Sequence, residues 1–239
     1  MDLKEVGLIG GSQETHWYYA SKSCALRRAL RGWQPHSIVD VGAGTGFFSR
    51  MLLRDTSATS ALCLDPGYPD DWSEVHFGKP LAFRRAGEVG SADLVLLMDV
   101  LEHVEDDVSL LREFAMSAGA RTRFVVSVPA FSWLWSPHDE FLGHRRRYTL
   151  QDVVRLIRAS GLSPTAGFYM FASVFPAVAA HRLWNRWWSV AQAPKSDLRE
   201  HNPWTNNLLA RLCLAECAVA PYNRAFGLTV FGVAEKRET

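Results

Sequence analysis

The stretch VDVGAGTGFFSR, residues 39–50, decides how the rest of the chain is interpreted. The chain enters it through an apolar run, SIVDV (37–41), and leaves it after three glycines at alternate positions through a helical pattern, FFSRMLL (47–53). Glycine permits positive φ and lets a ligand approach the backbone closely. The helix N-terminus that follows offers unpaired N–H groups and a favourable dipole. We therefore interpret residues 42–46 as a loop that binds a cofactor.

The composition is that of an ordinary globular protein. The 239 residues suffice for one well-filled α/β domain with modest additions, and 48% are hydrophobic and 21% charged. A net charge of +1 provides no field to hold nucleic acid, so no polynucleotide partner is expected. We also expect no signal peptide and no transmembrane segment, because no apolar run approaches the roughly 20 residues that a spanning helix needs.

The four cysteines have no metal-type spacing. Cys213 and Cys217 are four residues apart and would share one face of a helix, where buried thiols are favoured over a metal or redox role. These features predict a reducing, cytoplasmic location.

Apolar runs and helical patterns alternate along the chain. Strands are expected at residues 37–41, 61–64, 81–84, 92–100, 123–130, 165–170 and 227–236, and helices at 13–32, 47–53, 108–114, 151–160, 172–190 and 206–220. Residues 130–150 are interpreted as a loop rich in aromatic and cationic side chains. The alternation predicts right-handed crossovers and a doubly wound α/β sheet, with ligands at the carboxyl ends of the strands.

The glycine spacing narrows the choice of cofactor. A dinucleotide fingerprint places glycine at its first, third and sixth positions, but here Phe47 occupies the sixth, and no lysine follows as in a nucleotide-triphosphate loop. S-adenosylmethionine fits, because it carries adenosine without pyrophosphate. Asp65, 23 residues after Gly42, ends a strand and can accept hydrogen bonds from both ribose hydroxyls. Alternatively, Asp65 serves only to form a turn with Pro66 and Gly67. We favour the role at the ribose.

The motifs VDVGAGTGFFSRML, ALCLDP and ADLVLLMDVLEHVEDD resemble those of class I S-adenosylmethionine-dependent methyltransferases, particularly the small-molecule, bacterial type 11/12-like group. The resemblance covers roughly residues 13–170. It implies a Rossmann-like, seven-stranded sheet whose last strand, 227–236, is antiparallel. It also implies one domain over residues 1–239: a lid-like helix (13–32), a cofactor-binding core (37–129), and helical additions forming the acceptor site (130–150 and 168–210).

The resemblance implies roles for individual residues. Asp40, Gly42 and Gly44 are expected around the methionine portion of the cofactor, Gly46 at the turn, and Asp65 at the ribose. Met98 and Asp99 are expected near the amino group or the sulfonium. Tyr19, with Tyr18, is expected in a lid over the cofactor or in core packing, and Glu88 is the candidate for adenine. The expected cofactor-binding residues are thus Asp40, Gly42, Gly44, Gly46, Asp65, Met98, Asp99 and Tyr19.

Methyl transfer is an in-line displacement, so the protein mainly positions the acceptor and removes a proton from it. The leading candidates for the base are His138 and His144, because a histidine accepts a proton at neutral pH, with Asp139 as the nearby carboxylate that orients a histidine. His103 of the LEHV motif is a further candidate. The alternatives are that His144 and Tyr148 anchor the loop, or that His138, Asp139 and His144 bind a metal. We expect no metal.

The expected substrate-binding residues are Trp135, Arg146, Tyr148 and Tyr169. The run 145–147 is either a solvated surface run or a fork for a phosphate or carboxylate on a small-molecule acceptor. The aromatic segment 168–188 would wall an apolar pocket, touch a membrane surface peripherally, or form core and a dimer contact, so both monomer and homodimer stay open. The competing function is a non-catalytic cofactor-binding or assembly protein that uses this aromatic half as an interface.

Overall fold

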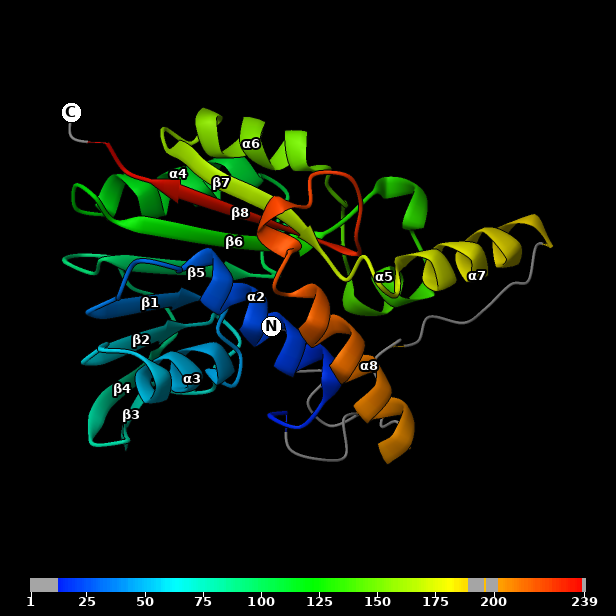
Figure 1. Ribbon diagram of the computed structural model, residues 1–239. Coiled ribbons are helices and arrows are strands. Elements are labelled where there is room, and N and C mark those ends of the chain that lie inside the picture. Colours follow the sequence, from blue (N-terminus) through cyan, green and yellow to red (C-terminus); the bar gives the residue numbers. More distant parts are fainter. Residues whose placement is uncertain (1–12, 189–195, 197–201, 238–239) are drawn as a thin grey trace.

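The computed structural model describes residues 13–188, 196 and 202–237. A twisted sheet carries helices on both faces (Figure 1). Its strands are β1 (Ser37–Val41), β2 (Ser60–Leu64), β3 (Trp72–His76), β4 (Lys79–Arg84), β5 (Leu94–Met98), β6 (Arg123–Pro129), β7 (Ser163–Met170) and β8 (Thr229–Glu235). The helices are α2 (Trp17–Ala29), α3 (Phe47–Asp55), α4 (Asp107–Ser117), α5 (Pro137–Leu142), α6 (Leu150–Ala159), α7 (Phe175–Trp187) and α8 (Pro203–Glu216), with short 3-10 helices η1 (Ser132–Leu134) and η2 (Ala220–Tyr222).

The strand order is β3-β4-β2-β1-β5-β6-β8-β7. The pairs from β4 through β2, β1 and β5 to β6 are parallel, whereas β8 is antiparallel to both β6 and β7. This confirms the doubly wound, Rossmann-like architecture with an antiparallel last strand. From β1 the chain first adds strands on one side of the sheet (β2, β4 and β3) and then crosses to the other side (β5 and β6). The strand order thus reverses between β1 and β5, and ligands of such sheets bind at the carboxyl ends of the strands at this point.

Two hydrophobic clusters sandwich the sheet. On one face, residues of α2, α3 and α8 pack against the sheet, and on the other those of α4 and α6 do so. Strand β5 belongs to both clusters, and all five of its residues are buried. A nearly uninterrupted apolar run is what a parallel strand covered on both faces requires, which is why this strand was predictable.

The sheet has eight strands where seven were expected. The additional strand, β3, pairs antiparallel with β4 at the edge of the sheet. Phe77 and Gly78, both with positive φ, form the two-residue connection, the geometry that matches the twist of a hairpin. Most of β3 is exposed, so it lacks the apolar pattern by which the other strands were predicted.

The interpretation of residues 130–150 as a loop was wrong in part, because they contain η1 and helix α5. Pro137 begins α5, Ser136 and Asp139 form a capping box, and Gly143 ends the helix with φ +74°. These are ordinary helix-start and helix-stop signals, but the six-residue helix is too short to show periodicity.

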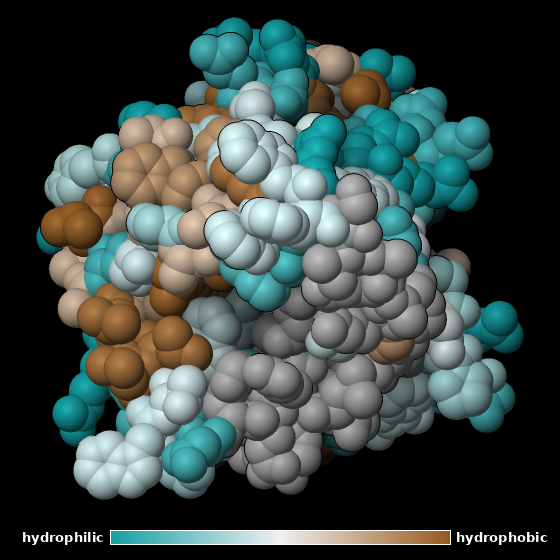
Figure 2. Space-filling view, turned by 90° about the vertical axis from the view of Figure 1, so that its right-hand side faces the viewer, coloured by the Kyte–Doolittle hydropathy of each residue, from teal (hydrophilic) through white to brown (hydrophobic). Residues whose placement is uncertain are grey.

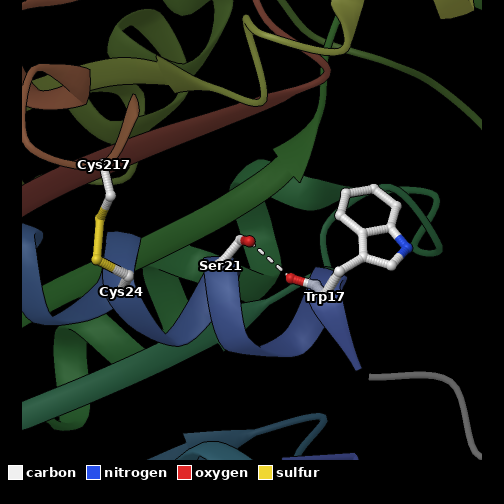
Figure 3. The surroundings of a disulfide bond; sticks show 4 residues. All are labelled: Trp17, Ser21, Cys24 and Cys217. Carbon is white, nitrogen blue, oxygen red and sulfur yellow. Dashed lines mark hydrogen bonds between the residues drawn. A yellow bond between two sulfur atoms is a disulfide. The ribbon is translucent and has the colours of Figure 1, made fainter. Parts of the chain in front are cut away.

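One cysteine expected as a thiol is oxidised. Cys213 is a buried free thiol, as expected, whereas Cys217 forms a disulfide with Cys24 of α2 (Figure 3). A sequence separation of 193 hides this pairing from the sequence. It forms because α2 and α8 pack side by side, which brings the middle of one helix to the end of the other.

Among the described residues, no helix is long and apolar enough to cross a membrane. Helices α7 and α8 carry exposed large apolar side chains, including Trp184, Trp187, Trp204 and Leu208. Figure 2 shows the side of the molecule from which α7 projects, where patches of hydrophobic residues, drawn in brown, are exposed. Most of residues 189–201, part of the expected acceptor-site segment, lies outside the described residues.

Candidate active site

The glycine loop connects β1 to α3 in a conformation that few other residues adopt. Gly42, Gly44 and Gly46 have φ of +63°, +55° and +71°. A Cβ on Gly42 would lie 2.6 Å from Val100, and one on Gly46 would lie 2.9 Å from Phe83. The backbone thus requires glycine for both its dihedral angles and its close packing.

Asp40 lies below this loop rather than in the open. It is 1% exposed, and Ser49 of α3 donates a hydrogen bond of 2.8 Å to its Oδ2. Burial raises the pKa of Asp40 to about 6. The carboxyl therefore ties the strand before the loop to the helix after it.

Asp65 faces the glycine loop from the end of β2. The Gly44 N–H donates to its Oδ2 at 3.0 Å, and the Gly67 N–H donates to its Oδ1 at 2.8 Å. A carboxylate has about four lone-pair sites, so two remain for further donors. The turn role and the ligand role considered for this residue are therefore compatible, because the turn fixes the carboxylate beside the loop.

Asp99 follows Met98 at the end of β5, where it adopts a positive φ of 58°. Lys22 of α2, which is fully buried, forms an ion pair with Asp99 and donates to the hydroxyl of Tyr18 at 3.0 Å. Ser127 donates to the other carboxylate oxygen at 3.0 Å. Burial works to raise the pKa of Asp99, but the adjacent Lys22 ammonium outweighs it and lowers that pKa. The ion pair fastens α2 over the end of β5.

Tyr19, on the same helix, is 1% exposed, and its ring lies 5.2 Å from that of Phe47, the first residue of α3. Met98 is 1% exposed at the end of β5. Both belong to the hydrophobic cluster that α2 and α3 form against the sheet, and Tyr19 packs there against the start of α3.

A second group of polar residues lies after β5. Glu102 is fully buried, and neither carboxylate oxygen has a hydrogen-bond partner among the described residues. Burial and then the nearby Asp99 raise the pKa of Glu102 well above its usual value. A ligand atom of Glu102 lies within 4.8 Å of one on His103 and one on His144, so the three side chains converge.

His144 is held by Asp139, as a base or a metal ligand would be. The Nδ1 of His144 lies 2.8 Å from Asp139 Oδ1, and both oxygens of Asp139 accept hydrogen bonds from Arg147. Burial works to raise the pKa of Asp139, but the hydrogen bonds from His144 and Arg147 outweigh it and hold that pKa below its usual range. Asp139 is therefore the carboxylate that orients His144.

His138 lies beside this pair. Its ring centroid is 6.3 Å from that of His144, and the ring of His103 is 4.8 Å from His144 on another side. The structure therefore brings together the four expected catalytic residues, His103, His138, Asp139 and His144. They come from the segment after β5, from α5 and from the turn after α5.

The arginine run fastens its loop to the segment after β5. Arg145 donates through its backbone N–H to Glu102 O and through Nε to His103 O. Arg146 donates to the carbonyls of Val104 and Glu105. The buried Tyr148 hydroxyl donates to Asp107 at 2.8 Å. These contacts tie the run to the segment after β5, and Arg146 stays partly exposed.

The remaining expected residues lie farther from this cluster. Trp135 is 39% exposed at the end of η1, and the hydroxyl of Tyr169 accepts a hydrogen bond from Leu150 N while its ring stacks on Phe131. Glu88 is exposed in the turn after β4. A cavity of about 400 Å³, lined by Asp107, Val108, Arg146, Arg147, Tyr148, Asp152, Arg155, Leu156 and Ala159, includes no residue of the glycine loop.

Two residues of this region were not singled out as site residues from the sequence. Lys22 lies 77 residues before its partner Asp99, and nothing in a helix pattern signals a buried cation. Glu102 stands inside the LEHV motif, but only the fold shows that it is buried without a partner.

Comparisons with known proteins agree with this geometry. A family model described as "Methyltransferase domain" matches residues 16–206. No curated protein sequence matches the chain.

Several solved structures share the fold. The chain is similar to a putative methyltransferase of Haloferax volcanii, solved in complex with the Trm112 activator (17% identity, TM-score 0.57, 95% of this chain and 92% of that chain). It is also similar to the 1,6-didemethyltoxoflavin-N1-methyltransferase of Burkholderia thailandensis, solved with S-adenosylhomocysteine (16%, 0.51, 91% and 77%). A third neighbour is the [4+2]-cyclase SpnF (13%, 0.55, 97% and 87%).

The sheet order, the glycine loop and the carboxylate of Asp65 define a class I S-adenosylmethionine-dependent methyltransferase. The chain belongs to the methyltransferase domain family, whose model spans most of its length. S-adenosylmethionine is the cofactor of this class.

Proposed function

We propose that this methyltransferase transfers the methyl group of S-adenosylmethionine to an oxygen or nitrogen atom of a small molecule. The observation that carries the proposal is the placement of two polar groups along one edge of the sheet. Asp65 and the glycine loop lie at the ends of β2 and β1, and the histidine cluster lies beyond the end of the adjacent β5. A methyl donor held by the first group would therefore point its sulfonium toward the second.

For the cofactor side, the remaining lone pairs of Asp65 accept the ribose hydroxyls, and the glycine loop accommodates the methionine portion. Helix α2, fixed by Lys22 and Asp99, covers this site. The segment after β4, which contains Glu88, is proposed to contact the adenine.

Isothermal titration with S-adenosylmethionine and S-adenosylhomocysteine tests this side. We expect micromolar binding to the wild type and at least tenfold weaker binding to Asp65→Ala, because the ribose loses a charged acceptor. Asp70→Ala, an exposed carboxylate nearby in sequence, serves as the control and leaves affinity unchanged. Absence of binding to the wild type contradicts the proposal.

For the acceptor side, we assign the general base to His138. It is half-buried next to His144 but is not the histidine that Asp139 holds. Because the sulfonium is already activated, removing the acceptor proton is the main chemical task left to a side chain.

His138→Ala should lower turnover by roughly 100-fold while changing cofactor affinity little, in line with the usual contribution of a general base. His181→Ala, an exposed histidine of α7, is the matched control. Single-turnover methylation with a competent acceptor measures the rate, and an unchanged rate would remove His138 from this role.

The acceptor is proposed to be small and to carry a phosphate or carboxylate. Arg146 already contacts Asp107 and two carbonyls, but it remains partly exposed and is the arginine that would meet such a group. Exposed tryptophans on α7 and α8 favour the competing reading of this half as an interface for a protein, a second copy or a membrane surface. Cofactor binding without turnover on any acceptor would favour a non-catalytic role.

The cytoplasmic location is also a proposal, and the Cys24–Cys217 disulfide opposes it, because disulfides rarely persist in reducing compartments. Trapping thiols by alkylation during cell lysis would show whether the pair is oxidised in the cell.

A further inference from the structure

Glu102 poses the sharpest chemical problem in the molecule. Its carboxyl is fully buried, and within the described part of the chain neither oxygen has a hydrogen-bond partner. Burying a carboxyl without a hydrogen-bond partner costs free energy, and native proteins contain few buried polar groups that lack one. Lys22, the nearest buried cation, is engaged with Asp99 and Tyr18 instead. A buried group of this kind calls for an ion or another ligand.

The neighbours of Glu102 have the right chemistry for a metal ion. Ligand atoms of Glu102, His103 and His144 all lie within 4.8 Å of one another. Ligands of one tetrahedral Zn²⁺ with bonds of about 2.0 Å lie roughly 3.3 Å apart, a difference that small side-chain rotations cover. We propose that Glu102, His103 and His144 bind one divalent transition-metal ion such as Zn²⁺.

The surroundings of His144 match those of a metal-bound histidine. Asp139 holds Nδ1 at 2.8 Å, which leaves Nε2 as the coordinating atom, and Arg147 holds Asp139 in turn. A carboxylate that orients a histidine in this way is the usual outer partner of a histidine ligand and fixes its tautomer. Such a role for His144 explains why the ion pair of Asp139 and Arg147 is buried next to its imidazole.

The backbone keeps the two halves of the site together. Arg145 N donates to Glu102 O at 2.7 Å, and Arg145 Nε donates to His103 O at 3.1 Å. The residue after His144 is thus bonded to both residues after β5 that supply ligands. Two imidazoles and one carboxylate suit Zn²⁺ and other first-row divalent ions, and three protein ligands leave a coordination position open.

The open position gives the site a role that rests on the proposed function. An acceptor hydroxyl bound there would lose its proton more readily, because a bound cation lowers the pKa of an oxygen ligand. His138, beside His144, takes that proton. The oxygen then forms its bond to the methyl carbon as the carbon–sulfur bond breaks, and the electron pair of that bond stays on sulfur. The site thus selects acceptors with a hydroxyl group.

Metal binding can be tested without any methyl acceptor. The full chain, stripped with chelator, is titrated with Zn²⁺ by calorimetry, and the metal content is measured after desalting. We expect one Zn²⁺ per chain with micromolar or tighter affinity. Glu102→Gln and His144→Ala should each weaken this binding about 100-fold, whereas His36→Ala, an exposed histidine at the start of β1, should not. Circular dichroism confirms that each variant is folded, and Glu102→Gln keeps the shape of the side chain.

Absence of stoichiometric Zn²⁺ binding to the wild type would overturn the proposal, as would binding that both variants retain. Co²⁺ substitution separates this site from the free thiols Cys63 and Cys213, because thiolate ligands add an intense charge-transfer band that this donor set lacks. Zn²⁺ binding without any methyl transfer would contradict the proposed function and leave the metal site standing. Methyl transfer by metal-free protein would contradict the role of the metal in removing the acceptor proton and leave the proposed function standing.

Discussion

At the scale of single residues, Asp40 shows that a motif position found in the sequence acquires its contacts only in the folded chain. Its place at the end of β1 was predictable, because an apolar run stops at the glycines. Its partner was not, since Ser49 reaches it only after the loop has folded back. The aspartate was expected around the methionine portion of the cofactor, and the structure places it in the layer that supports the loop.

The pH dependence of stability tests this burial. The pKa of Asp40 is raised from 3.8 to about 6, so between these values the folded chain holds a proton that the unfolded chain has lost. Stability therefore falls as pH rises through this window and is constant, for this residue, above it. Asp40→Asn removes the effect. The free energy of unfolding of the variant relative to wild type should rise by up to about 3 kcal/mol between pH 4 and 7.

Urea denaturation of the cofactor-free proteins at several pH values measures this difference. Ser49→Ala is a useful companion, because it removes the donor and should raise the pKa of Asp40 further. A difference between Asp40→Asn and wild type that does not change with pH would show that the carboxyl is solvated in the folded state.

At the scale of elements, prediction succeeded where a segment carries its own pattern. Strand β5 is apolar throughout, and α6 begins at the Thr149 capping box, so both were found close to their true limits. Strand β3 and helix α5 were missed because one is an exposed edge strand and the other has only six residues. Pairings between elements could not be predicted, and the site depends on them: Lys22 reaches Asp99 across 77 residues.

The disulfide between α2 and α8 has a testable effect on stability. Crosslinking over 193 residues restricts the unfolded chain, and losing a native disulfide typically costs about 2–5 kcal/mol. We expect the paired variant Cys24→Ser/Cys217→Ser to lose stability in this range in guanidinium denaturation. Reductant should destabilise the wild type to the same level and leave the variant unaffected. Equal stability of wild type with and without reductant would mean that the crosslink contributes nothing.

At the scale of the whole molecule, the class of fold followed from the order of motifs along the chain. Alternating strands and helices leave few topologies once crossovers are right-handed. The antiparallel position of β8 was expected only from the family resemblance. The residue pattern of 227–236 predicts a strand but not its neighbours in the sheet. The acceptor side was least predictable, since it is built from segments whose chemistry depends on tertiary contacts.

Because β8 lies between β6 and β7, we predict that the sheet does not fold stably without it. Seven residues of β8 pair with β6 on one side and with β7 on the other. A chain ending at Leu228 should lose the cooperative unfolding transition and become sensitive to protease, because two buried strand edges are left unpaired. A chain ending at Lys236 is the control and should behave as wild type. Persistent cooperative unfolding of the shorter chain would contradict this account.

The same strand order has a consequence for biosynthesis. Strand β8 is made after every other described strand of the sheet, yet it lies between two strands made earlier. Until residue 235 emerges, β6 and β7 lack the strand that pairs with both of them. The part of α6 that later packs on β8 is also uncovered until then. The half of the sheet around β1 can form during translation before β8 is made, but the other half must wait until β8 has emerged. The nascent protein therefore exposes unpaired strand edges during synthesis, when chaperones would be needed most.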